Sequence, residues 1–345
     1  MNRKINLAAL KTSMANKKKQ QAKQKRADRR KWWLWGILLA LVVGVAGYIV
    51  YSVNTSEEKL APGFGLGGVT YCQSTPKFAK DMGYDDSAIM STNETLKGLF
   101  IYDRPLQVGQ PLTHVYQHPT WDDVGYLGTP VNDGEGNIYV APAPRVNLYD
   151  NPPEQQNTIY KVDTDTGELA EYIKLPFAAP MPPENPFGII GLAYDCDTNS
   201  LYAASVYGSG KDTEVGIIYQ VDLDTGKVES QLKNVDAFGL GVFNRIAGKR
   251  LYFGLTRKSE VWSVALGNDG KIRGKPRFEF SMAGWGADGD DKARRIVFRK
   301  ADEMFVRGSA FNYNLIAGTE RIQPDYFLRY DPAQDIWLRE EDPQQ

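Results

Sequence analysis

Cysteine and histidine are scarce in this chain of 345 residues, which has two of each. The histidines, His114 and His118, are too few for a histidine-rich metal site and argue against a Ser-His-Asp or Cys-His hydrolase. Two cysteines form neither a disulfide scaffold nor a thiolate metal site. They leave two alternatives: one bridge between Cys72 and Cys196, which an oxidising compartment permits, or two buried thiols. A G-x-x-x-x-G-K-[ST] phosphate loop is also missing.

Charge is unevenly distributed along the chain. Of the 41 basic and 42 acidic residues, residues 1–56 hold twelve basic and one acidic, so residues 57–345 carry a formal net charge of −12. An acidic balance of this kind argues against a nucleic-acid partner for the C-terminal part. The basic tail could bind anionic lipid or RNA, but its simpler role is a topology signal.

One long uncharged run follows the basic tail. No charged residue occurs from Trp32 to Ser56, and tryptophans at one end and tyrosines at the other suit the two membrane boundaries. Basic residues before the run and Glu57 and Glu58 after it predict a cytoplasmic N-terminus. The rival reading is a cleaved signal peptide, but its leader of about 31 residues would be unusually long and no convincing cleavage site follows.

These patterns predict four parts of the chain. They are a basic cytoplasmic tail (1–31), a transmembrane signal-anchor helix (32–53), a flexible linker (54–66) and a periplasmic or extracellular domain (67–345). The chain is thus expected to be a single-pass membrane protein that contacts the membrane through residues 32–53.

The C-terminal part contains internal repeats. T-I-Y-K-V-D-T-D-T-G (158–167) recurs as I-I-Y-Q-V-D-L-D-T-G (217–226), and weaker copies begin near residues 99, 261 and 326. A second strand type recurs in phase with it, as N-I-Y-V (137–140), S-L-Y-A (200–203), R-L-Y-F (250–253) and E-M-F-V (303–306). The unit of strands and turns is typical of a propeller blade. We expect an all-β propeller of five blades, or six if residues 60–76 pair differently; a β-sandwich is the structural alternative.

The best-defined repeats resemble blades of a known superfamily. G-I-I-G-L-A-Y-D (188–195), L-Y-A-A (201–204) and Y-x-V-D-x-D-T-G resemble the NHL, SMP-30/gluconolactonase and YVTN-type propellers over roughly residues 124–282. The resemblance implies the fold but no particular function, because such blades occur in enzymes and in binding modules alike.

Long loops rich in aromatic and polar residues alternate with tight D-x-D-T-G turns, so a ligand or protein partner is expected on the long-loop face. The candidate residues for that face are Trp121, Asp122, Tyr149, Asn185, Tyr207, Trp285, Asp288, Asn312 and Tyr313.

Two functions fit these features. The first is a membrane-tethered binding or scaffolding module for an envelope protein or ligand, with no cofactor. The alternative is a metal-dependent hydrolase of the SMP-30/gluconolactonase type, in which oxygen ligands converge on a divalent cation such as Ca²⁺ or Zn²⁺. Its candidate ligands are Glu184, Asn185, Asn244 and Asp288.

Overall fold

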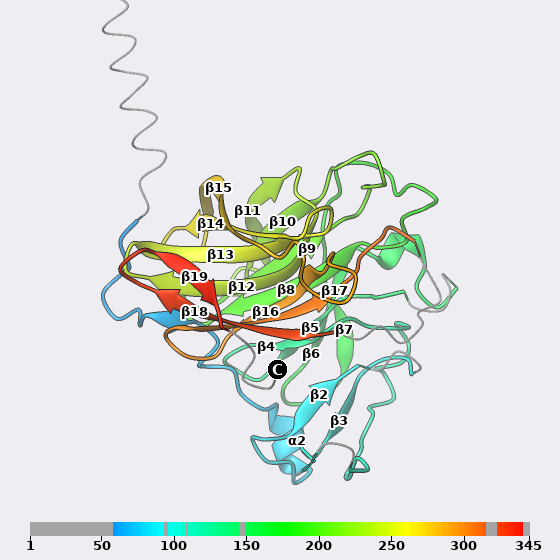
Figure 1. The fold of residues 1–345 in the computed structure, drawn as a ribbon. Helices are drawn as coiled ribbons and strands as arrows, with labels where there is room; N and C mark the ends of the chain where they lie inside the picture. The colour runs from blue at the N-terminus through cyan, green and yellow to red at the C-terminus, as the bar shows by residue number, and fades with distance from the viewer. Residues whose placement is uncertain are drawn as a thin grey trace, which may run out of the picture. The chain divides into compact units, whose positions relative to one another are not determined.

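The structure is a computed structural model, and it describes residues 58–92, 96–105, 107, 110–144, 149–314 and 323–340 (Figure 1). These residues belong to one compact unit of the chain. None of the helices formed by the described residues is long and apolar enough to cross a membrane. The predicted tail, the predicted transmembrane helix (32–53) and most of the predicted linker lie outside the described residues.

The described residues are almost entirely β-structure, and we number their sheets in chain order. Sheet I is short and contains β2 (Ile89–Ser91) and β3 (Phe100–Tyr102). It is preceded by the only described α-helix, α2 (Lys77–Asp81), and a 3₁₀ turn, η1 (Pro153–Gln155), occurs later. Sheet II contains, in spatial order, β4 (Val131–Asn132), β5 (Ile138–Val140), β6 (Thr158–Val162) and β7 (Leu169–Lys174).

The three later sheets have longer strands. Sheet III contains β8 (Ile189–Asp195), β9 (Ser200–Ser205), β10 (Ile217–Asp222) and β11 (Lys227–Lys233). Sheet IV contains β12 (Ala237–Arg245), β13 (Gly248–Leu255), β14 (Glu260–Leu266) and β15 (Ile272–Ser281), with β1 (Gly67–Gly68) added beside β12. Sheet V contains β16 (Lys292–Phe298), β17 (Glu303–Ser309), β18 (Asp325–Asp331) and β19 (Ile336–Arg339).

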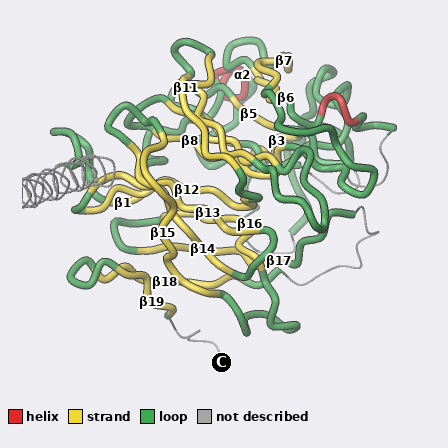
Figure 2. The backbone as a smooth tube through the Cα atoms, turned by 90° about the horizontal axis from the view of Figure 1, so that it is seen from above, coloured by secondary structure: helices red, strands yellow, loops and turns green. Residues whose placement is uncertain are grey.

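Neighbouring sheets pack face to face in chain order. Separate hydrophobic clusters lie between sheets I and II, II and III, III and IV, and IV and V. The first strands β8, β12 and β16 lie side by side (Figure 2). Sheets arranged one after another around their first strands form a β-propeller, so the β-sandwich alternative is wrong. Six aromatic residues of the repeats are predicted to lie in the core. Five of them are buried between the sheets (Tyr139, Tyr160, Tyr202, Tyr219 and Tyr252), whereas Trp262 is half-buried and packs against the cluster between sheets III and IV.

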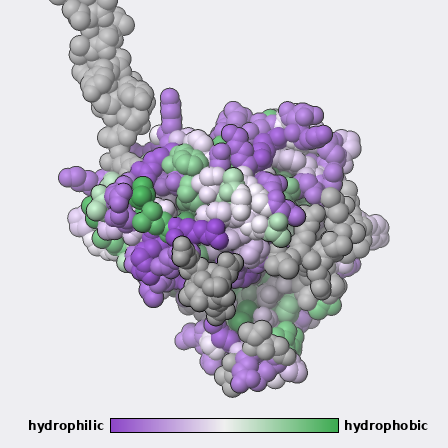
Figure 3. Space-filling model, viewed as in Figure 1, coloured by the Kyte–Doolittle hydropathy of each residue, from purple (hydrophilic) through white to green (hydrophobic). Residues whose placement is uncertain are grey.

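The outer surfaces of the sheets are mostly polar. β11 alternates exposed and half-buried residues, and the alternate residues of β18 that point away from the core are exposed. This period of two is expected where one face of an antiparallel sheet meets water. The surface in Figure 3 is accordingly dominated by hydrophilic residues, with small scattered hydrophobic groups.

The two ends of the strands differ in their connections. Within sheets II to V, each first strand joins the second, and each third the fourth, through a tight turn, whereas long loops such as 206–216 lie at the other end. The repeated Asp makes the tight turn: Asp163 Oδ1 accepts the backbone N–H groups of Asp165 and Thr166 at 3.0 Å. Gly167 ends this turn at φ +75°, a conformation that glycine adopts without strain. The predicted long-loop face and tight-turn face therefore both exist.

Residues 58–78 cross the tight-turn face, and we call them the strap. The strap begins on sheet IV, where Ala61 N–H donates to Asn268 Oδ1 and β1 pairs with β12. It continues to sheet III, where Val69 O accepts Cys196 N–H, and ends on sheet II, where Phe78 N–H donates to Thr164 O. Part of the predicted flexible linker, Lys59 to Leu66, thus lies in the strap. Its backbone donates one hydrogen bond to the Asn268 side chain and accepts others from Asn268 and Asn244.

A disulfide fastens the strap to sheet III. Cys72 in the strap and Cys196 in the β8–β9 turn are bonded, with their Cα atoms 5.8 Å apart and a sequence separation of 124. The sequence left the bridge open because the two cysteines come from distant units. In the folded chain the strap crosses the tight-turn face and places Cys72 beside the β8–β9 turn.

Cys72→Ser should lower the free energy of unfolding, because the unfolded chain has more conformational entropy without the disulfide than with it. For a loop of this length the chain-entropy model predicts about 5 kcal/mol at most. Denaturant unfolding measures the loss, with wild-type protein under reducing conditions as the matched comparison. Labelling of non-reduced, denatured protein should find no free thiol; two thiols per chain would contradict the bridge.

Candidate functional site

A cavity of about 370 Å³ lies along the central channel. Its walls are residues of the first strands β4, β8, β12 and β16, and strap residues Gly68, Thr70 and Gln73 also line it. The volume is at the lower end of the range for small-molecule sites. None of the described residues that line it is Asp, Glu or His.

Aromatic side chains gather at the long-loop end of the cavity. Phe187 precedes β8, Phe238 begins β12 and Phe311 follows β17, and all three line the cavity. Phe311 lies with its ring centroid 5.8 Å from that of Phe187 and 5.1 Å from that of Phe238. Such pairs favour a flat apolar partner at this end of the channel.

The wall formed by β16 is basic. Arg294 and Arg295 both line the cavity, and Arg295 remains accessible to solvent there. Burial of its guanidinium lowers the pKa of Arg295, and the neighbouring Arg307 and Arg299 lower it further. The channel therefore combines an aromatic end with a positively charged wall.

One buried carboxylate organises the loops around the channel. Asp236, directly before β12, accepts hydrogen bonds from Ser209 Oγ at 2.5 Å, Arg257 Nε at 2.9 Å and the Tyr313 hydroxyl at 2.5 Å. These partners come from the long loops of sheets III, IV and V. Burial and the hydrogen bond to Asp236 raise the pKa of Tyr313, which keeps its hydroxyl a donor. Asp236 thus ties three loops together on the long-loop face.

Some residues predicted for the long-loop face do lie there, in supporting positions. Asn185 is fully buried, and its amide donates to the backbone oxygens of Val206 and Ser209, both at 2.8 Å. Tyr207 stacks on Phe177 with a centroid distance of 4.6 Å. Tyr313 binds Asp236, and Asn312 caps its own loop by accepting Asn314 N–H. These contacts shape the loops around the channel.

Other predicted residues do not line the cavity. Trp121 is completely buried, and its indole N–H donates to Gly167 O at the tight-turn end, so it is not available to a ligand. Trp285 packs between Phe280 and Tyr326 on the outer part of sheets IV and V. Asp122, Tyr149 and Asp288 are exposed loop residues outside the cavity lining. An aromatic residue in a loop sequence does not reveal whether it packs inward.

The candidate metal ligands do not converge. Asn185 precedes β8 at the long-loop end, whereas Asn244 lies near the end of β12 at the tight-turn end. Both amides already hold backbone or carboxylate oxygens. Glu184 and Asp288 belong to different loops, and the described residues contain no group of three His, Cys, Asp or Glu side chains placed to hold a metal ion. These residues do not fit the divalent-cation site of the hydrolase alternative.

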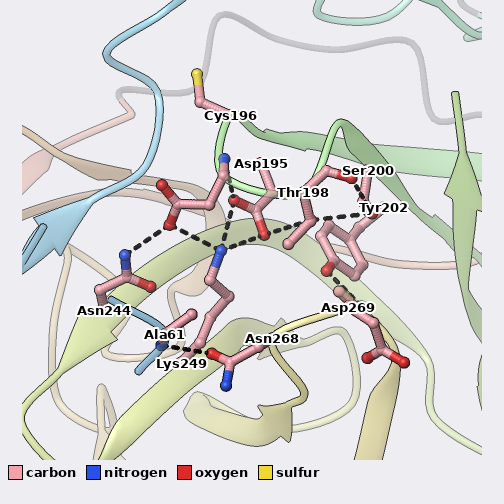
Figure 4. Close-up of polar contacts among 12 residues, drawn as sticks. Ala61, Asp195, Cys196, Thr198, Ser200, Tyr202, Asn244, Lys249, Asn268 and Asp269 are labelled. Carbon is pink, nitrogen blue, oxygen red and sulfur yellow. Dashed lines mark hydrogen bonds and ion pairs between the residues drawn. The ribbon is translucent and has the colours of Figure 1, made fainter. Parts of the chain in front are cut away.

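A buried ion cluster lies at the tight-turn end (Figure 4). Lys249 Nζ of β13 donates to Asp195 at 2.7 and 2.8 Å and contacts Asp197 Oδ2 at 2.8 Å, with all three side chains at most 1% exposed. Burial raises the pKa of Asp195, and the contact with Lys249 offsets only part of this increase. Burial also acts to raise the pKa of Asp197, but hydrogen bonds from Lys249, Tyr71 and Asn244 outweigh it and the pKa is lowered.

This cluster joins the strap to two sheets. The Tyr71 hydroxyl in the strap donates to Asp197 at 2.6 Å, and Asn244 Nδ2 donates to both Asp197 and Gly65 O. The ammonium of Lys249 also lies 4.5 Å from the centre of the Phe64 ring. Each of its charged groups has a partner of opposite charge inside the protein, so we assign the cluster a structural role.

Lys249→Met should destabilise the domain strongly, because it leaves two buried carboxylates without their cation. Breaking a buried ion pair in this way costs about 3–5 kcal/mol. Chemical denaturation of the variant measures the loss. Lys275→Met, on the exposed part of β15, is the matched control and should unfold like wild type; equal stability of the two variants would contradict the structural role.

Comparisons with known proteins find distant structural likenesses. No family model matches the chain, and no curated protein matches it. Among solved structures, a calcium-binding protein, regucalcin, from Agrobacterium tumefaciens is 16% identical, with 81% of this chain and 79% of that chain covered and a TM-score of 0.45. A luciferin-regenerating enzyme is 12% identical over 79% of this chain and 76% of that chain, with a TM-score of 0.43.

A third similar structure is the PQQ-bound aldose sugar dehydrogenase of Streptomyces coelicolor, 14% identical over 80% of this chain and 82% of that chain, with a TM-score of 0.41. These TM-scores lie below 0.5, so the expected resemblance to SMP-30-type propellers concerns the fold alone and rests on the sheets of this chain. Likenesses this distant assign no ligand or reaction, so the class of protein is a β-propeller and its function has to be argued from its own residues.

Sequence reasoning missed the residues of the channel. Arg295 was not singled out, because the sequence around a strand residue gives no signal that the residue borders a channel. Asp236 was also missed, although a lone Asp directly before an apolar strand could have suggested a loop anchor.

Proposed function

We propose that the chain is a membrane-tethered, extracytoplasmic binding protein whose propeller holds a small ligand in its central channel. The observation that carries this proposal is the cavity of about 370 Å³, which opens among aromatic side chains and has no described carboxylate or histidine in its lining. A site of this composition suits binding through apolar contact and hydrogen bonds. Its described lining offers no Asp, Glu or His side chain for general acid–base or metal catalysis.

The proposal includes the architecture of the ring. The five sheets of the described residues correspond to the five blades expected from the repeats, with the short sheet I as the irregular first blade. Six blades would require a further sheet from residues that the structure does not describe.

The proposal also includes the location of the domain. The uncharged run 32–53 behind twelve basic residues supports a signal anchor with the propeller outside the cytoplasm. The disulfide between Cys72 and Cys196 supports an oxidising compartment.

Protease added outside intact cells or spheroplasts should digest the propeller domain and spare a tag placed before Met1. Immunoblots against the tag and against the domain measure both ends of the chain. A domain that stays intact until the membrane is dissolved would overturn the extracytoplasmic location.

Binding in the channel can be tested by filling it. Ala310 is half-buried and lines the cavity, so Ala310→Trp should occupy the ligand's space without removing a buried contact. Ala287→Trp, in the exposed loop before β16, is the matched control. The full chain in lipid nanodiscs is screened by ligand-observed NMR against a set of water-soluble acids, amines and neutral aromatic compounds.

The expected result is at least one compound that binds wild type and Ala287→Trp and is lost with Ala310→Trp. If no compound in the set shows that pattern, the channel is not a ligand site and the proposed function fails.

A further inference from the structure

Arg295 occupies a particular place on β16. It is the fourth of the seven residues Lys292 to Phe298 and pairs in register with Arg307 of β17. Ile296 and Phe298, on the other side of the strand, pack into the core between sheets IV and V. Arg295 is therefore on the face of sheet V that turns away from this core, and it also lines the channel.

The positive charge around Arg295 is only partly neutralised. Arg307 forms an ion pair with Asp325, in which Nε and Nη2 donate to the two carboxylate oxygens at 2.7 and 3.0 Å. Arg299 stacks on Phe305 and Phe327, with its guanidinium carbon 4.6 and 5.6 Å from the ring centres. Arg295 itself makes no ion pair with any carboxylate in the described part of the chain.

A folded protein rarely keeps an uncompensated guanidinium next to two others. Each like charge raises the free energy of the group, and the protein around the channel partly desolvates it, although its side chain is still exposed to water in the channel. A bound anion relieves both costs, and a guanidinium presents a fork of N–H donors that matches a carboxylate, sulfonate or phosphate.

We propose that the channel takes a small organic anion with a flat apolar body, its anionic group held by Arg295 and its body lying against Phe187, Phe238 and Phe311. The inference rests on the proposed function and specifies its ligand class. The aromatic end of the cavity lies on the long-loop face, and Arg295 lines the same cavity from β16, so one cavity offers both contacts. The absence of Asp and Glu from the described lining matters equally, because a carboxylate there would repel an anion and attract a cation.

Two matched probes separate the anionic contact from the apolar one. Naphthalene-1-sulfonate and naphthalene-1-sulfonamide share a flat ring system and differ in charge. Isothermal titration calorimetry of each is done with the full chain in nanodiscs, with empty nanodiscs as the blank. The variants are Arg295→Gln and Arg295→Lys, with Arg273→Gln on the exposed part of β15 as the control; Arg273 pairs with Asp269 at 3.0 Å and does not line the cavity.

Wild type and Arg273→Gln should bind one sulfonate per chain, at least about tenfold more tightly than the sulfonamide, as expected for a hydrogen bond between charged groups. Arg295→Gln should bind both probes with the sulfonamide's affinity, and Arg295→Lys should retain part of the preference. Circular dichroism and the melting temperature confirm that each variant is folded.

Equal affinity of wild type for the two probes, failure of both to bind, or unchanged sulfonate binding by folded Arg295→Gln would overturn the anion proposal. These outcomes leave the proposed function standing if the screen still finds a neutral or cationic compound that Ala310→Trp excludes. Loss of every channel ligand in the screen would overturn both.

Discussion

The strap depends on one buried cation, and the channel depends on the strap. Lys249 is surrounded by Asp195 and Asp197, which belong to the end of β8 and the following turn, while its own strand belongs to sheet IV. The same carboxylate of Asp197 accepts the hydroxyl of Tyr71 in the strap. A buried charge needs all its partners in place, because each unpaired member costs several kcal/mol. The cluster therefore specifies where two sheets and the strap meet.

The strap gives the two ends of the channel different characters. At the tight-turn end, Gly67 and Gly68 approach sheet V so closely that a Cβ on Gly68 would lie 2.6 Å from the Cβ of Phe298. Only glycine allows the strap this close to β16. At the other end, Asp236 joins the loops of three sheets by accepting hydrogen bonds from Ser209, Arg257 and Tyr313. One end is covered by backbone, and the other is framed by loops that surround aromatic side chains.

This arrangement supports the proposed binding function. The acidic groups of the central region are used within the protein: Asp195 and Asp197 bind Lys249, and Asp236 anchors loops. The charged side chains among the described lining residues are those of Arg294 and Arg295 on β16, and both are basic. A channel of this kind differs in charge from one in which oxygen ligands would hold a divalent cation.

The sequence alone determined the repeat, the strand and turn pattern and the burial of the repeat tyrosines, because these follow from local periodicity and from the conformations that Asp and Gly favour in tight turns. It also separated a long-loop face from a tight-turn face. Only the tertiary structure decided that Cys72 reaches Cys196, that Trp121 packs inward, and that Arg295 and Phe311 share a cavity. The physical reason is that each of these contacts joins distant blades or the strap, and the position of a residue around a ring has no signature in its neighbouring sequence.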